Sequence, residues 1–135
     1  MTAPENFELL EDYAVFRPTG RVSLAKGVQW VTSAITYCRE RGIRKLLVDT
    51  CSLTGFAPPA VHTRYFFMHE WAAAAAGAVC IAMVARREMI DPEKFGVTVG
   101  RNAGLVCDVF SLESEADAWL RNVKPCKAAR PVKKS

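Results

Sequence analysis

The chain has 135 residues, of which half are apolar and 24% are charged, and its formal net charge is +4. This length fits one domain that buries its own core, and no apolar run is long enough to cross a membrane. The N-terminal residues lack the basic and apolar regions of a signal peptide, so the sequence predicts a cytoplasmic protein without a membrane span.

The first predicted element is a β-hairpin within residues 7–20, where two short apolar runs flank an acidic pair. A helix follows, because five apolar residues recur at the spacing of one buried stripe: Leu24, Val28, Val31, Ile35 and Cys38. Ser23 is a suitable N-cap, and Gly42 lies where a C-terminal glycine belongs. Residues 45–50 then predict a central strand that is covered on both faces.

A second helix is predicted over residues 58–77, because the Pro58–Pro59 pair suits the first turn of a helix. Its expected sheet-facing stripe consists of Val61, Tyr65, Met68, Ala72 and Ala75. Three large aromatic residues do not fit this stripe: Phe66, Phe67 and Trp71. An apolar surplus of this kind favours a ligand wall or a subunit contact.

Residues 78–85 predict the next central strand, and Arg86 and Arg87 follow its carboxyl end. Residues 91–104 predict a third helix, started by the pair Asp91 and Pro92. Three glycines lie four residues apart on one face of this helix: Gly96, Gly100 and Gly104. We therefore expect this helix to approach a neighbouring element closely.

A last strand is predicted over residues 105–111 and a last helix over residues 111–123. The complete order is ββαβαβαβα. Strands separated by helices of this length require crossovers and a mostly parallel sheet, to which the opening hairpin adds an antiparallel part. The sequence therefore predicts an α/β sandwich in which helices pack on a short mixed β-sheet.

The positive charge is concentrated at the C-terminal end of the chain. The last twelve residues contain no acidic residue and five basic ones: Lys124, Lys127, Arg130, Lys133 and Lys134. We expect one near-neutral domain over residues 1–123 and a flexible basic tail over residues 124–135. Such a tail can bind nucleic acid through counterion release, but most short basic termini are solvated ends, so nucleic acid is not an expected partner.

The element order, the strand-to-helix junction that starts at residues 45–56 and the block of residues 100–120 together resemble the STAS-like superfamily. These are the domains named for sulfate transporters and anti-sigma factor antagonists, with their lipid-binding relatives. The most specific residues look like the ending of small stand-alone bacterial members: Asn102, Gly104, Val109, Phe110, Ala118, Trp119 and Leu120. The resemblance covers roughly residues 7–121. It implies a STAS-like sandwich that acts as a non-catalytic regulatory or protein-interaction module.

The regulatory switch of antagonist-type STAS domains is altered here. In those domains an Asp-Ser-Ser-Gly turn follows the strand, and a partner kinase phosphorylates a serine of this turn. The matching positions in this chain are Ala57, Pro58, Pro59 and Ala60, so the usual phosphoserine is missing. Phosphorylation at Ser52 or Thr54 is the displaced alternative.

The candidate binding residues follow the carboxyl ends of two predicted parallel strands or lie on the helix between them: Thr50, Ser52, Thr54, Pro58, Phe67, Trp71, Arg86 and Arg87. Ligands of open α/β sheets bind at this edge, and a helix N-terminus near Pro58 would add donors that suit an anion. The hypothesis is a site for an anion, a phosphate or a lipid head group. The alternative is that the hydroxyls satisfy turn backbones and the arginines are solvated.

Three functions remain open. The first is a protein-interaction module, as a monomer or a homodimer, and the second is a carrier or sensor of a small anionic or lipid-like ligand. The third is a small hydrolase, which needs Asp49, Cys51 and His62 to converge. No recognisable spacing supplies a further orienting group, so no catalytic residue is predicted. The five cysteines contain no CxxC pair, and neither a metal nor a cofactor is expected.

Overall fold

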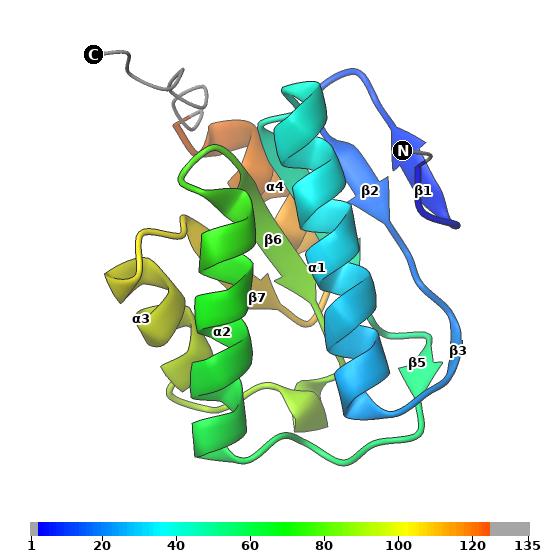
Figure 1. Cartoon of the computed structure of the whole chain (residues 1–135), viewed down its shortest axis with the longest axis vertical. Coiled ribbons are helices and arrows are strands. Elements are labelled where there is room, and N and C mark those ends of the chain that lie inside the picture. Colours follow the sequence, from blue (N-terminus) through cyan, green and yellow to red (C-terminus); the bar gives the residue numbers. More distant parts are fainter. Residues whose placement is uncertain (1–2, 125–135) are drawn as a thin grey trace.

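The computed structural model describes residues 3–124, and the predicted basic tail lies almost wholly outside the described residues. The centre is a five-stranded sheet in the order β1-β2-β4-β6-β7 (Figure 1). Its strands are β1 (Phe7–Leu9), β2 (Ala14–Phe16), β4 (Lys45–Asp49), β6 (Cys80–Val84) and β7 (Cys107–Phe110). The β1–β2 pair is antiparallel, and all the other neighbours are parallel. The predicted mixed sheet is therefore confirmed.

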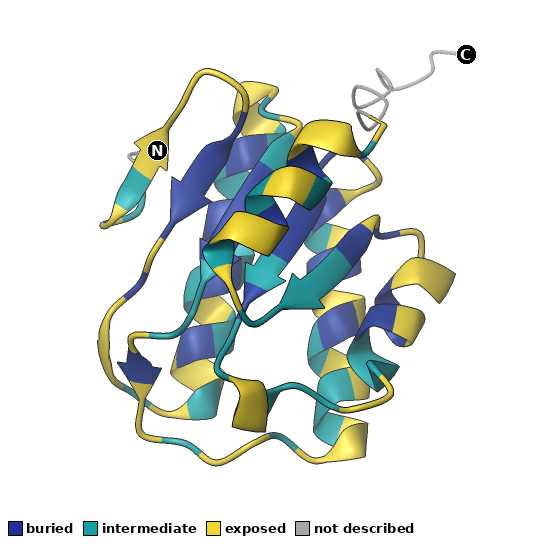
Figure 2. Ribbon diagram, turned by 180° about the vertical axis from the view of Figure 1, so that it is seen from behind, coloured by how far each residue is buried: buried dark blue, intermediate teal, exposed yellow. Residues whose placement is uncertain are grey.

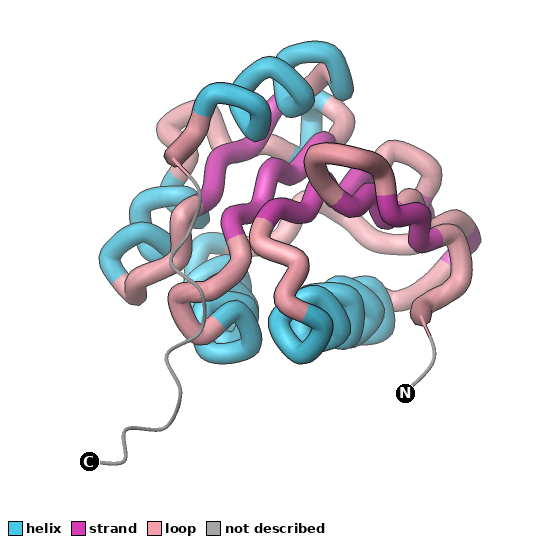
Figure 3. The backbone as a smooth tube through the Cα atoms, turned by 90° about the horizontal axis from the view of Figure 1, so that it is seen from above, coloured by secondary structure: helices cyan, strands magenta, loops and turns pink. Residues whose placement is uncertain are grey.

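Within the described residues, four helices cover this sheet unequally (Figure 3). They are α1 (Leu24–Arg41), α2 (Val61–Ala75), α3 (Phe95–Asn102) and α4 (Glu113–Asn122). The first three helices share one core with residues such as Phe16 and Ile81, whereas Ala116 and Leu120 of α4 belong to a second core on the other face. Because both faces are covered, the central strands are almost entirely buried (Figure 2). The predicted α/β class is confirmed.

None of the four described helices is both long and apolar enough to span a membrane.

A second, two-stranded sheet, which the sequence pattern does not predict, fixes the loop after β4. Its strands β3 (Gly20–Arg21) and β5 (Leu53–Thr54) are parallel, and the Val22 N–H donates to the Thr54 carbonyl at 2.8 Å. Gly55 has φ of +106°, and a Cβ there would lie 2.5 Å from the Val22 carbonyl oxygen, so the turn requires glycine. Strands of two residues are too short to show a period-2 pattern.

Helix α1 begins and ends where the sequence predicts. The Lys26 N–H donates to Ser23 Oγ at 3.1 Å, and Gly42 takes the left-handed conformation with φ of 74°. The expected stripe is fully buried at three positions: Val31, Ile35 and Cys38. Leu24 and Val28, at the N-terminal end of the same stripe, are only half buried because a cavity lies beneath them.

Two predictions for α2 were wrong. The helix begins at Val61 rather than at Pro58, because a proline restricts the preceding residue to extended backbone and the chain stays extended through Ala60 (φ −69°, ψ 163°). The inward stripe also differs, because Val61 and Tyr65 are 56% and 46% exposed. Arg64 takes an inward position instead, which an apolar pattern does not predict.

Helix α3 begins at Phe95 instead of the predicted Asp91. A short 3-10 turn, η1 (Arg87–Met89), follows β6, and Asp91 Oδ2 then accepts the N–H groups of Glu93 and Phe95 at 3.1 and 2.9 Å. Lys94 is left-handed, with φ of 52°, so the helix begins only after it. The Asp91 carboxylate thus stabilises a turn before the helix.

The predicted close approach of α3 occurs at two of its three glycines. A Cβ on Gly96 would lie 3.5 Å from Met68 Cγ, and a Cβ on Gly100 would lie 2.7 Å from Met68 Cε, so these positions face α2. The prediction was wrong for Gly104, which follows the helix with φ of +94° and has open space around it.

Candidate functional site

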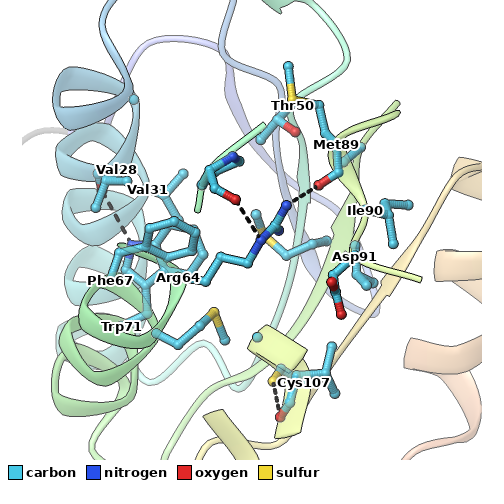
Figure 4. A pocket seen from close by; sticks show the side chains of 18 of the residues that line it. Val28, Val31, Thr50, Arg64, Phe67, Trp71, Met89, Ile90, Asp91 and Cys107 are labelled. Atoms are coloured by element: carbon cyan, nitrogen blue, oxygen red, sulfur yellow. Dashed lines mark hydrogen bonds between the residues drawn. The ribbon is translucent and has the colours of Figure 1, made fainter. Parts of the chain in front are cut away.

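A cavity of about 130 Å³ lies at the carboxyl ends of β4, β6 and β7. It is bordered by α1, α2 and α3, by the segment between β4 and α2, and by the segment between β6 and α3 (Figure 4). This is the edge at which open α/β sheets bind ligands. The cavity is therefore the candidate functional site.

Aromatic and sulfur-containing side chains form the apolar walls of the cavity. The Phe67 and Trp71 rings lie 4.7 Å apart between centroids, and the Trp71 indole N–H donates to the Val28 carbonyl at 3.3 Å. This hydrogen bond fixes the orientation of the indole. Four sulfur-containing residues complete the walls, among them three of the four methionines of the chain: Met68, Met83, Met89 and Cys107. Thioether side chains adapt readily to the shape of a bound group.

Arg64 connects two segments that border the cavity. Its Nε donates to the Pro59 carbonyl and its Nη2 to the Met89 carbonyl, both at 3.1 Å (Figure 4). We call this pair of bonds the Arg64 bridge. Sequence reasoning missed Arg64, although its spacing from Met68 and Trp71 (i, i+4, i+7) is that of one helix face.

Arg86 brings a second guanidinium to the cavity. Its Nη2 donates to the Leu53 carbonyl at 3.3 Å. Its Nε is buried and has no hydrogen-bond partner among residues 3–124, and the Glu88 carboxylate forms an ion pair with it at 3.8 Å, too far for a hydrogen bond. A buried N–H without an acceptor is unfavourable by about 1–3 kcal/mol. An anionic oxygen at this atom would remove that cost.

The two carboxylates in the cavity lining already have partners. Asp108 accepts a hydrogen bond from Lys94 Nζ at 2.8 Å and lies 3.5 Å from Arg101 Nη2. Asp91 accepts the backbone N–H groups of the turn before α3. The charged groups of the lining are therefore the cations Arg64, Arg86 and Lys94 and the carboxylates of Asp91 and Asp108, which leaves one positive charge in excess.

Four of the eight predicted site residues line the cavity together: Thr50, Phe67, Trp71 and Arg86. The other four are exposed and lie outside its lining: Ser52, Thr54, Pro58 and Arg87. The Thr50 hydroxyl donates to the Val84 carbonyl at 3.0 Å, so it satisfies the turn backbone. Helix α2 begins at Val61, so the free backbone N–H groups of its first turn do not lie at Pro58.

The three residues of the hydrolase hypothesis are in different environments. The Cys51 N–H donates to Asp49 Oδ1 at 2.9 Å, and burial together with the Asp49 carboxylate raises the pKa of the Cys51 thiol to about 11. The thiol is therefore protonated at neutral pH. His62 lies exposed in the first turn of α2.

Asp49 also interacts with Glu113 at the start of α4. Hydrogen bonds from Arg17, at 2.8 and 3.0 Å, together with the contact with Asp49, lower the pKa of Glu113 to about 2. Burial and the same contact raise the pKa of Asp49. This cluster lies on the α4 side of the sheet edge and does not line the cavity.

Comparisons of this chain with protein-family models, curated proteins and solved structures find no match to it. Among the described residues, no group of three or more His, Cys, Asp or Glu side chains is arranged to hold a metal ion.

Proposed function

We propose that the protein binds a small ligand with an apolar body and an anionic group, and acts as a carrier or sensor of that ligand. The observation that carries the proposal is the buried Arg86 Nε, which lacks a hydrogen-bond partner among the described residues, beside a cavity with apolar walls. Burial of the apolar body against Phe67 and Trp71 provides the main favourable free energy. A charge-assisted hydrogen bond from Arg86 orients the anionic end.

Native mass spectrometry of the full chain, purified gently from its own cells, tests this proposal. We expect a discrete non-covalent adduct in the wild type that is lost in Arg86→Gln. Arg87→Gln is the matched control, because Arg87 is the adjacent arginine and is exposed outside the cavity lining. Absence of an adduct, together with no binding from a library of small organic acids, would contradict the proposal.

A STAS-like regulatory module is the second candidate function. It is supported by the opening hairpin beside parallel strands and by an exposed apolar patch on α2, which we call the outer patch: Val61, Tyr65 and Phe66. Phe66 is 67% exposed, and its ring lies 5.6 Å from that of Tyr65. An exposed aromatic pair of this kind is typical of a protein contact.

Substitutions at two adjacent phenylalanines distinguish the two proposed functions. Phe66→Ser removes an exposed ring, so it is expected to weaken a protein contact, or a homodimer measured by analytical ultracentrifugation, without affecting ligand binding. Phe67→Ser changes the cavity wall and should weaken ligand binding instead. If Phe66→Ser leaves both the protein contact and the homodimer unchanged, the outer patch is not a contact surface.

A further inference from the structure

We propose that the ligand is a carboxylic acid with a single aromatic ring, between benzoate and phenylacetate in size, with its ring in the cavity and its carboxylate at Arg86. This inference rests on the proposed function, because it names the ligand class of the same cavity. Three independent properties of the cavity support it: its volume, the chemistry of its walls and the number of hydrogen-bond donors that remain available.

The volume limits the apolar body to about one ring. The cavity measures about 130 Å³, and an apolar protein cavity of about 150 Å³ holds one benzene molecule. A long acyl chain would leave most of its length outside, where burial provides no favourable free energy. The size therefore favours one ring over a lipid chain.

The walls favour an aromatic body over a saturated one. Met68, Met83 and Met89 place thioether groups around the cavity, and a thioether sulfur makes favourable contacts with aromatic rings. The Phe67–Trp71 pair adds ring surfaces suited to edge or offset stacking. The hydrogen bond of Trp71 to Val28 holds this surface in place before a ligand binds.

The available donors fit a single negative charge. Arg64 Nε and Nη2 are already bonded to backbone carbonyls, and Lys94 is bonded to Asp108. The Thr50 hydroxyl donates to Val84. Among residues 3–124, the buried side-chain donor without a hydrogen-bond partner is the Nε–H of Arg86. Its nearest carboxylate is the exposed Glu88 at 3.8 Å, which a ligand carboxylate would replace as the partner of this atom. A phosphate dianion in the same place would lack the donors that its second charge needs.

Isothermal titration of the full chain with a probe series tests this inference. The probes are benzoate, phenylacetate, benzamide, phenyl phosphate and hexadecanoate. We expect benzoate or phenylacetate to bind with a Kd on the order of 10 µM to 1 mM. Benzamide, which has nearly the same shape but no charge, should bind about 10- to 100-fold more weakly. Arg86→Gln should cause a similar loss for benzoate, and Arg87→Gln should change its Kd less than about 2-fold.

The outcomes separate this inference from the function on which it rests. Tighter binding of hexadecanoate or phenyl phosphate than of benzoate would overturn the ligand class and leave the carrier function in place. An adduct of another class in native mass spectrometry would do the same. Equal Kd values for benzamide and benzoate would show that Arg86 does not recognise the charge of the ligand. If no probe binds and the purified protein carries no adduct, both proposals fail.

Discussion

The Arg64 bridge is expected to contribute measurably to stability, because it joins the segment before α2 to η1, which has no buried residue of its own. The side chain donates to the carbonyls of Pro59 and Met89 at 3.1 Å each. A hydrogen bond from a charged group contributes about 1.5–3 kcal/mol. Both bonds are only partly buried, so each released carbonyl regains water. We therefore expect Arg64→Met, which keeps the apolar stem, to lower the free energy of unfolding by about 1–3 kcal/mol.

Urea unfolding followed by tryptophan fluorescence measures this change, with an unchanged m-value as the sign of an intact two-state transition. Arg64→Lys should be intermediate, because one ammonium group does not reproduce the planar fork that reaches two carbonyls. Arg87→Met is the control, and its free energy of unfolding should stay within about 0.5 kcal/mol of the wild type because Arg87 is exposed. Hydrogen exchange should become faster in η1 of Arg64→Met.

Two results would refute this reasoning. One is an Arg64→Met variant that unfolds within about 0.5 kcal/mol of the wild type. The other is an Arg64→Lys variant as stable as the wild type, which would mean that charge alone is needed and the two-carbonyl geometry is irrelevant.

Three further predictions concern α3, Cys51 and Glu113. Gly96→Ala should raise stability by up to about 1 kcal/mol through helix propensity. Gly100→Ala should not, because its Cβ would lie 2.7 Å from Met68 Cε and 3.1 Å from the Sγ of the buried Cys107, so both side chains would have to shift. Equal gains in thermal denaturation would contradict the close packing. Because the pKa of Cys51 is raised to about 11, its alkylation by iodoacetamide, followed by peptide mass spectrometry, should be slow at neutral pH and rise about tenfold per pH unit. A plateau near pH 8.5 would refute this. The pKa of Glu113 is lowered from 4.5 to about 2, so its stabilisation is present above pH 4.5 and lost as the pH falls through 2. Glu113→Gln should cost about 1 kcal/mol above pH 4.5, after discounting for solvent screening, and nothing near pH 2; a constant difference would contradict the shift.

The elements that the sequence predicts well are those in which several local signals agree. In α1 the Ser23 cap, the Gly42 terminator and the buried stripe indicate the same boundaries, and the structure has them. The central strands are continuous apolar runs between turn residues, so their positions can also be predicted from the sequence. The start of α3 is different, because the carboxylate of Asp91 bonds two backbone N–H groups and delays the helix to Phe95. A sequence pattern contains the cap residue but not the geometry that it stabilises.

The candidate site could be predicted in part for a similar reason. Thr50 and Arg86 follow adjacent parallel strands, so their meeting at one sheet edge is a consequence of topology. The same rule predicts Ser52 and Thr54 at this edge. In the β3–β5 pairing, however, Leu53 between them lines the cavity, whereas both Ser52 and Thr54 are exposed. That pairing depends on residues more than thirty positions apart, and no local pattern contains it.

The rotation of α2 about its own axis decides which of its residues line the cavity, and the hydrophobic pattern of the helix does not predict this rotation. The helix carries apolar residues on nearly all sides, so an apolar stripe can be drawn through Tyr65 as well as through Met68. The structure selects the rotation that places Arg64 inward, where its bridge satisfies two carbonyls. That rotation directs Phe67 to the cavity wall and leaves Phe66 exposed. The same rotation buries Met68, Trp71, Ala72 and Ala75. The cavity and the outer patch are therefore on separate faces of one helix, and a substitution on one face tests one proposed function without changing the other face.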